Sequence, residues 1–235
     1  MRAYIPNFIT CLNLLSGCLA CLMAFEGNFL WALWFIILSA VFDFFDGFAA
    51  RILKAYSAMG KELDSLADLI SFGMAPGLIV FKYLSISEIG ITSEIASYLP
   101  YLGFFIPVFS ALRLAKFNID DRQTSSFIGL PVPANALFWA SLIPALIQLS
   151  DKYTFLPFIC IALVFIFSWL LVSNIPMFSL KISKCTWKGN EIAIVFVCMC
   201  ILILSISNIY WGISLCICTY ILISLLSNLI CKKTK

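Results

Sequence analysis

Four aspartates stand out in this sequence because of their spacing and their surroundings. Asp43 and Asp46 are three residues apart near the end of one apolar stretch, and Asp64 and Asp68 are four apart at the start of the next. Residues at these spacings share one face of a helix. If the two stretches pair antiparallel around the intervening 51–61 loop, we expect all four carboxylates to meet at one depth, close to a membrane surface.

Carboxylates gathered in this way predict a site for divalent cations. Like charges held together do not all ionise unless cations neutralise them, and ionisable groups at membrane depth are costly and usually functional. Oxygen ligands of this kind favour Mg²⁺ or Mn²⁺. The alternative is that the aspartates are interfacial charges facing water beyond the helix ends, which suits Asp64 alone better than it suits all four.

The residues around the aspartates suit a ligand that contains phosphate. Arg51 places a fixed cation beside the acidic cluster, and guanidinium groups bind phosphate oxygens well. Gly47, Ala50 and Gly60 are small enough to let helix backbones approach each other and a ligand closely. The chain has no histidine, so any general acid or base has to be a carboxylate, a lysine, a tyrosine or a cysteine.

The composition places these residues in an integral membrane protein. Of the 235 residues, 63% are hydrophobic and 11% are charged, and the mean hydropathy is +1.04, whereas about 25% of a typical soluble domain is charged. A net charge of +3 is too small to suggest nucleic acid as a partner. Cys18 and Cys21 form the only CxxC spacing, and without a second pair they are expected to pack as small hydrophobic residues.

Apolar stretches of about 20 residues predict membrane-spanning helices. Eight such stretches predict an all-α, polytopic helix bundle that forms a single domain over residues 1–235. Thirteen of the 15 basic residues lie in alternate loops on one side, and only Lys82 and Lys152 lie on the other, so the positive-inside rule predicts that both termini are cytoplasmic. The predicted spans are residues 7–25, 28–50, 65–84, 95–113, 128–149, 154–174, 191–208 and 211–231.

The aspartates belong to a longer pattern, D-x2-D-G-x2-A-R-x8-G-x3-D-x3-D, which runs from Asp43 to Asp68. Because every fixed position is matched, the chain is identified as a member of the CDP-alcohol phosphotransferase family. The resemblance implies transfer of a phosphatidyl or related group from a CDP-linked lipid to an alcohol, with release of CMP. It also implies that Asp43, Asp46, Asp64 and Asp68 bind two divalent ions, Mg²⁺ or Mn²⁺, and that Asp68 is the general base for the acceptor hydroxyl.

The same resemblance assigns further residues to the CDP-linked lipid. Gly47 and Arg51 resemble positions that contact the pyrophosphate, and Ser57 aligns with a hydroxyl position that does the same. The stretch Pro6-Asn7-Phe8-Ile9-Thr10 resembles the P-N-x-x-T sequence of the family, which lines the cytidine pocket. Asn7 is therefore expected to contact the nucleotide.

Three later stretches bear on the acceptor alcohol. Residues 71–77, 111–118 and 127–134 together look like the phosphatidylserine synthase branch of the family, which implies CDP-diacylglycerol and L-serine as substrates. The resemblance covers residues 5–185, which would form the catalytic core. The two additional spans over residues 191–231 match only in length and hydrophobicity.

Serine carries a carboxylate and an ammonium group, so its pocket needs a cation and hydrogen-bond acceptors. Arg113, Lys116 and Asn118 lie at the end of the fourth predicted span, level with the aspartates. Our hypothesis is that Arg113 or Lys116 pairs with the serine carboxylate and that Asn118 helps to orient it. The simpler alternative is that these residues only set the topology.

Other functions stay open at this stage. Another acceptor, such as glycerol 3-phosphate, inositol phosphate or choline, would use the same metal site. A cation transporter would need polar residues that continue across the membrane, whereas these spans are apolar to the far side. A catalytically inactive scaffold is disfavoured because every motif position is present. From the resemblance we also expect a homodimer in a bacterial inner membrane, with the active site facing the cytoplasm.

Overall fold

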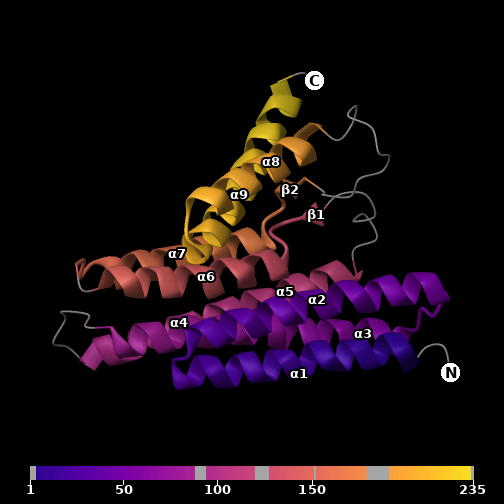
Figure 1. Ribbon diagram of the computed structural model, residues 1–235, viewed down its shortest axis with the longest axis horizontal. Helices are drawn as coiled ribbons and strands as arrows, with labels where there is room; N and C mark the ends of the chain where they lie inside the picture. The colour runs from indigo at the N-terminus through magenta and orange to yellow at the C-terminus, as the bar shows by residue number, and fades with distance from the viewer. Residues whose placement is uncertain (1–3, 88–93, 120–126, 151, 179–190, 234–235) are drawn as a thin grey trace.

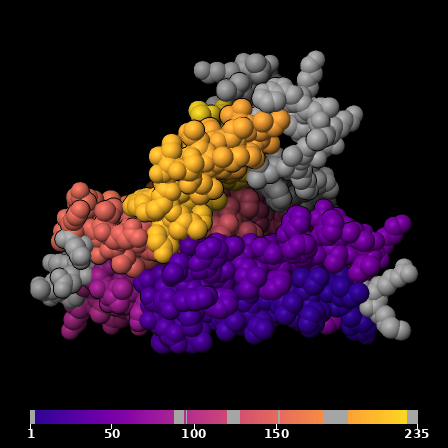
Figure 2. Space-filling view, in the orientation of Figure 1, coloured from indigo at the N-terminus to yellow at the C-terminus, as the bar shows by residue number. Residues whose placement is uncertain are grey.

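The computed structural model describes residues 4–87, 94–119, 127–150, 152–178 and 191–233. Most of these residues are helical, which confirms the predicted all-α membrane bundle. Helices α1 to α7 run along the long axis of the molecule, and the helical hairpin α8–α9 crosses this bundle obliquely (Figure 1). Figure 2 shows the hairpin standing out from the surface formed by the N-terminal helices.

The first two helices form a tight antiparallel pair, α1 (Tyr4–Glu26) and α2 (Phe29–Leu53). Gly27 makes the turn between them with a φ of 82°, a backbone conformation that glycine adopts without strain. The buried face of α1 consists of small or polar residues, among them Ser16, Gly17 and Ala20. Small side chains at an interface let helix backbones approach closely, and α2 and the third span both pack against this face.

The third span runs without a break from Ala58 to Ile86. It consists of α3 (Ala58–Asp68), the π-helical segment η1 (Leu69–Met74) and α4 (Ala75–Ile86). Pro76 accounts for the widened turn, because proline has no N–H to donate to the preceding turn and its ring needs space there. Asp68 therefore lies at the point where the helix geometry changes.

The next three spans complete the bundle. The 3₁₀ helix η2 (Glu94–Phe104) continues into α5 (Phe105–Ile119), and α6 (Val132–Ser150) and α7 (Leu156–Val172) follow. Two short strands, β1 (Phe127–Ile128) and β2 (Pro176–Met177), pair antiparallel beside the end of α7. Gly129, with a φ of 80°, follows β1, and its N–H donates to the carbonyl of Ile175 at 2.8 Å.

The C-terminal hairpin consists of α8 (Glu191–Ile206) and α9 (Ile209–Lys233). Helix α9 packs on α6, where the hydroxyl oxygens of Ser141 and Ser214 are 2.7 Å apart. All eight predicted apolar segments are helical; within the described ranges, six are long and apolar enough to cross a membrane, and α7 and residues 193–206 form shorter apolar helices. Several basic residues used to predict the orientation lie outside the described residues: Arg2, Arg122, Lys181, Lys184, Lys188 and Lys235.

Candidate active site

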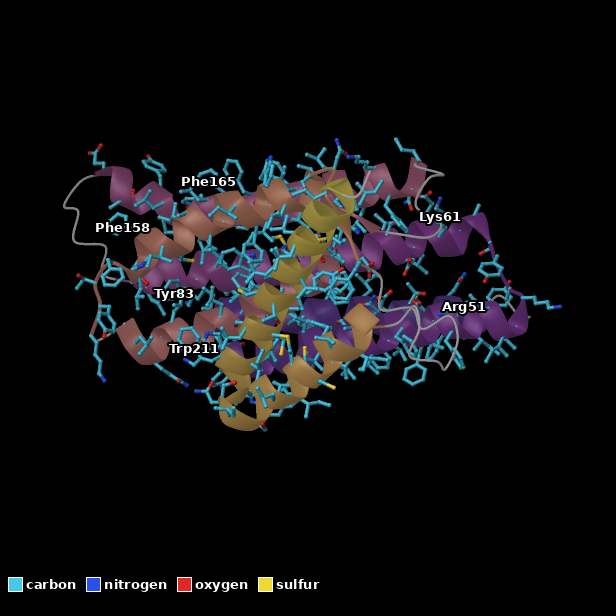
Figure 3. All side chains as sticks on the ribbon, turned by 90° about the horizontal axis from the view of Figure 1, so that it is seen from above. Arg51, Lys61, Tyr83, Phe158, Phe165 and Trp211 are labelled. Atoms are coloured by element: carbon cyan, nitrogen blue, oxygen red, sulfur yellow. The ribbon has the colours of Figure 1, made fainter. Side chains whose placement is uncertain are left out.

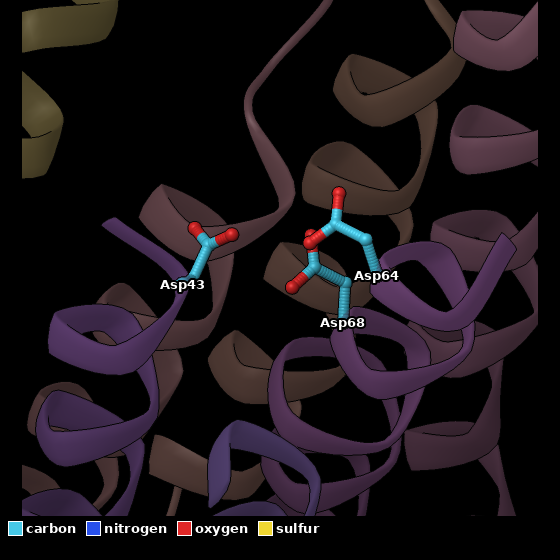
Figure 4. A group of neighbouring side chains, drawn as sticks. All are labelled: Asp43, Asp64 and Asp68. Atoms are coloured by element: carbon cyan, nitrogen blue, oxygen red, sulfur yellow. The ribbon is translucent and has the colours of Figure 1, made fainter. Parts of the chain in front are cut away.

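Three of the four aspartates converge where α2 meets α3. Asp43 projects from α2 toward Asp64 and Asp68 on α3 (Figure 4). One carboxylate oxygen from each residue lies within 4.8 Å of the corresponding oxygens of the other two. Oδ1 of Asp64 is buried and has no hydrogen-bond partner. Three carboxylates with a free buried oxygen fit a hard divalent cation, which prefers oxygen ligands.

Asp46 is oriented differently from the other three aspartates. Its Oδ2 accepts a hydrogen bond of 2.7 Å from Oγ1 of Thr10 on α1. Residues three apart on a helix are offset by about 60° around its axis, so Asp46 faces α1 while Asp43 faces α3. The prediction that all four carboxylates meet is thus met for three of them, and Asp46 lies beside the cluster rather than in it.

A cavity of about 470 Å³ opens next to the carboxylate cluster. Its walls come from the beginning of α1, the end of α2 and the beginning of α3. Arg51 and Lys61, which both contribute to it, lie at the same end of the bundle, far from Tyr83 and Phe158 (Figure 3). The lining residues are Pro6, Asn7, Asp46, Gly47, Ala50, Arg51, Ala55, Tyr56, Ser57, Gly60, Lys61 and Asp64.

This cavity brings together all four residues that the sequence resemblance assigns to the CDP-linked lipid, namely Asn7, Gly47, Arg51 and Ser57. They come from three helices and are up to 50 residues apart in the chain. Because Asp46 and Asp64 line the same cavity, a phosphate group held there would be close to the carboxylates.

Local backbone structure sets the shape of the cavity. Helix α2 ends at Leu53, and the left-handed backbone of its C-cap residue Lys54 (φ 50°) turns the chain toward α3. Ser57 caps α3, and its Oγ accepts a 3.0 Å hydrogen bond from the N–H of Gly60, so its own O–H is still available as a donor. A Cβ atom on Gly60 would lie 3.0 Å from Oδ1 of Asn7. Glycine at this position therefore keeps the floor of the cavity open.

The arginine proposed for the acceptor is buried close to the carboxylates. Arg113 on α5 is 7% exposed, and its Nε has no hydrogen-bond partner. The guanidinium carbon lies 5.7 Å from the centre of the Phe117 ring. Arg113 is also close enough to Asp68 for a direct Coulombic interaction. A buried guanidinium with a free N–H is suited to an anionic ligand.

The other two acceptor candidates already have protein partners. Nζ of Lys116 donates to Oδ1 of Asn174 at 2.7 Å, which ties α5 to the segment after α7. Nδ2 of Asn118 donates to Oγ of Ser65 at 2.8 Å, and the Asn118 carbonyl accepts from Nζ of Lys61 at 2.8 Å. The side chains of Lys116 and Asn118 thus connect α5 to its neighbours, whereas Nε of Arg113 has no hydrogen-bond partner.

The sequence interpretation overlooked one residue next to the cluster. Asn13 on α1 is fully buried, and its Nδ2 donates to Oδ1 of Asp68 at 3.2 Å. A signal for it exists in the sequence, because Thr10, Asn13 and Ser16 recur every three residues within an otherwise apolar span. This spacing marks a polar face on α1.

The fold and the site define a helical membrane protein with a carboxylate cluster at one end of its bundle, beside a cavity lined in part by Arg51 and Lys61. A family model described as CDP-alcohol phosphatidyltransferase matches residues 3–178. The chain therefore belongs to the CDP-alcohol phosphatidyltransferase family. Membership confirms the family indicated by the aspartate pattern and identifies the chain as a phosphotransferase.

Three relatives with assigned names are similar to this chain over more than half of its length. The CDP-diacylglycerol–serine O-phosphatidyltransferase of Helicobacter pylori is 32% identical over 199 residues, covering 81% of this chain and 78% of that protein. The Bacillus subtilis protein of the same name is 40% identical over 135 residues, covering 55% of this chain and 70% of its own length. An archaetidylserine synthase of Methanothermobacter thermautotrophicus is 31% identical over 141 residues, which cover 57% of this chain and 54% of that protein. All three names specify serine.

Proposed function

We propose that this protein is a phosphatidylserine synthase, which transfers the phosphatidyl group of CDP-diacylglycerol to the hydroxyl of L-serine and releases CMP. The observation that carries the proposal is the convergence of Asp43, Asp64 and Asp68 beside a cavity lined by Asn7 and Arg51. The choice of serine rests on the names of the relatives and on the buried Arg113, whose Nε has no hydrogen-bond partner.

Two divalent cations, Mg²⁺ or Mn²⁺, are proposed to bind at the four aspartates. Asp43, Asp64 and Asp68 offer a compact set of oxygen ligands, and Asp46 reaches the site from the cavity side. Bound there, such ions would neutralise the carboxylates and draw negative charge off the pyrophosphate.

The cavity residues would bind the CDP portion of the lipid. Asn7, at the beginning of α1, offers an amide to the cytosine base, and Gly47 leaves room for the pyrophosphate because no other atom lies within 4 Å of the position that its Cβ would take. Nε of Arg51 donates to the carbonyl of Gly47 at 3.0 Å, which fixes the guanidinium while its remaining N–H groups stay free for phosphate oxygens. Ser57 adds its free O–H.

Asp68 is proposed as the general base. It would accept the proton of the serine hydroxyl as the hydroxyl oxygen attacks the phosphorus that carries diacylglycerol, and the bond from that phosphorus to the CMP oxygen breaks. The amide of Asn13 donates to one oxygen of Asp68, which holds the carboxylate in one orientation. A carboxylate in this role is consistent with a chain that has no histidine.

Arg113 is proposed to bind the serine carboxylate. Its burial, its unpaired Nε and its interaction with Asp68 all support this role. The contacts of Lys116 and Asn118 favour a supporting role for these two residues, in which they hold α5 against Asn174 and Ser65. The ammonium group of serine would then face the carboxylate cluster, which carries the opposite charge.

The site is proposed to face the cytoplasm of a bacterial cell. Arg51, Lys54 and Lys61 lie at the end of the bundle that contains the cavity, and basic residues favour the cytoplasmic side. This end suits both substrates, because the nucleotide arrives from water while the acyl chains stay in lipid. Assembly as a homodimer stays a prediction based on the family.

The acceptor is tested with purified protein in detergent, CDP-diacylglycerol and Mn²⁺ or Mg²⁺. CMP release is measured with L-serine, glycerol 3-phosphate, inositol phosphate, choline or no acceptor. We expect metal-dependent release with serine and only background release with the others. Release with a different alcohol would leave the family assignment intact and refute serine as the substrate.

A further inference from the structure

A buried polar network lies directly beneath the aspartates, and α1 is at its centre. Oγ1 of Thr10 donates to Oδ2 of Asp46 at 2.7 Å, and Nδ2 of Asn13 donates to Oδ1 of Asp68 at 3.2 Å. Thr10 is 3% exposed and Asn13 is 0% exposed. The two residues are three apart and share one face of α1, so a single helix contacts carboxylates on both α2 and α3.

The backbone of Asn13 also connects α1 to α2 and to the third span. Its carbonyl accepts hydrogen bonds from Oγ of Ser39 on α2, at 3.2 Å, and from Oγ of Ser71 in η1, at 3.1 Å. Ser39 precedes Asp43 by one helical turn, and Ser71 follows Asp68 by three residues. Both serines are 0% exposed. The position of each aspartate-bearing helix is therefore set relative to one peptide group of α1.

The close approach of η1 to α1 depends on Gly17. A Cβ atom at this position would lie 2.8 Å from the Cα of Ser71, a distance that real Cβ atoms do not adopt. Glycine therefore lets the segment that follows Asp68 reach the Asn13 carbonyl. The contact between α1 and η1 therefore depends on both Gly17 and the hydrogen bond from Ser71 to Asn13.

We propose that Thr10 and Asn13 are positioning residues, which fix the carboxylates of Asp46 and Asp68 in the arrangement that binds the divalent cations. The inference rests on the proposed function. A donor that occupies one oxygen of a carboxylate determines which oxygen faces the metal and restricts the side-chain rotamer. Thr10 and Asn13 are not among the residues that line the cavity, so we infer that they act through the aspartates.

The chain offers a matched control on the same helix. Oγ of Ser16, one turn after Asn13, donates to the carbonyl of Phe35 at 2.8 Å. Ser16 is as buried as Thr10, at 3% exposed. It also connects α1 to α2, but it contacts no aspartate. Loss of a buried hydrogen bond between helices can thus be separated from loss of a bond to a carboxylate.

The test compares Thr10→Val, Thr10→Ser, Asn13→Leu and Ser16→Ala with the wild-type protein. Binding of Mn²⁺ to each purified variant is followed by electron paramagnetic resonance of the free ion, and kcat and KM for serine are measured in parallel. Thr10→Val and Asn13→Leu are expected to weaken Mn²⁺ binding by ~10–100-fold and to lower kcat, with a smaller change in KM. Thr10→Ser keeps the hydroxyl and should recover most of the Mn²⁺ affinity, and Ser16→Ala should bind Mn²⁺ like the wild-type protein.

The outcomes distinguish failure of the positioning role from failure of the proposed function. If Thr10→Val binds Mn²⁺ as Ser16→Ala does while the wild-type protein releases CMP with serine, the positioning role is refuted and the proposed function stands. If the wild-type protein itself neither binds Mn²⁺ nor releases CMP, both are refuted. If Asn13→Leu fails to fold, the comparison of Thr10→Val with Thr10→Ser still tests the positioning role, because valine and threonine have nearly the same shape.

Discussion

Arg113 has an unusual environment for a charged side chain. It is 7% exposed, its Nε donates to nothing, and no carboxylate forms an ion pair with it among the described residues. A buried N–H group without an acceptor is costly unless a ligand supplies the acceptor. The carboxylate of serine would do so at the depth of Asp68.

Replacing Arg113 by alanine should therefore affect serine binding selectively. One charge-assisted hydrogen bond contributes about 1.5–3 kcal/mol, so we expect Arg113→Ala to raise KM for serine by ~10–100-fold and to leave KM for CDP-diacylglycerol within ~3-fold of the wild-type value. Steady-state kinetics with each substrate varied in turn measures both constants. An unchanged KM for serine would exclude Arg113 from the acceptor pocket.

Arg51 is expected to contribute to binding of CDP-diacylglycerol and not of serine. Its guanidinium lines the cavity and is fixed by the Gly47 carbonyl, so Arg51→Ala is expected to raise KM for CDP-diacylglycerol by ~10-fold or more with little effect on KM for serine. Lys54→Asn is the matched control, because Lys54 is exposed at the same helix end and asparagine tolerates its left-handed backbone. Equal effects of the two substitutions would point to a general loss of positive charge and not to a phosphate contact.

At the scale of the elements, the sequence predicted the helices but not their irregular parts. The eight helical segments could be predicted because each apolar run is long and charged or turn residues separate the runs. The π-helical segment η1 was not predicted, because a proline within an apolar run indicates a lost helix hydrogen bond but not whether the helix widens, kinks or ends there. The orientation of Asp46 was missed for a related reason: its partner Thr10 is 36 residues away in the chain, and a periodic pattern carries no information about such contacts.

Gly129 lies in the short connection from β1 to α6. Its φ of 80° suits glycine, and a Cβ atom there would lie 2.6 Å from the carbonyl oxygen of Leu171. Gly129→Ala should therefore combine backbone strain with a steric clash and destabilise the fold by ~2–4 kcal/mol. Gly27→Ala has a similar φ of 82° but its nearest contact would be the flexible end of Lys82 at 3.4 Å, so only the strain of ~1–2 kcal/mol is expected.

The midpoint of thermal unfolding in detergent compares the two substitutions. A lower midpoint for Gly129→Ala than for Gly27→Ala supports the assigned clash with Leu171. Equal midpoints would show that the β1–α6 connection adapts to a methyl group and would refute the clash with Leu171.

At the scale of the whole molecule, Arg51 and Lys61 lie at one end of the bundle together with the candidate active site (Figure 3). The turn between α6 and α7, which contains Tyr153, lies at the other end. If the first end is cytoplasmic, a phosphatase reporter fused after Tyr153 in a bacterial host should be exported and active, and one fused after Tyr56 should be inactive. Activity after Tyr56 and none after Tyr153 would reverse the orientation and place the proposed CDP-binding cavity outside the cytoplasm.

The central claim is that carboxylates held by α2 and α3 catalyse transfer of a phosphatidyl group to serine, and formation of the lipid product tests it most directly. Purified protein is incubated with CDP-diacylglycerol, Mn²⁺ and isotope-labelled L-serine, and the lipids are extracted and analysed by mass spectrometry. We predict labelled phosphatidylserine from the wild-type protein, none after EDTA treatment, and a rate lower by ~10²–10⁴-fold for Asp68→Asn, which retains the shape but loses the base. Labelled product formed equally well by folded Asp68→Asn, or no labelled lipid from folded wild-type protein with metal present, would contradict the account.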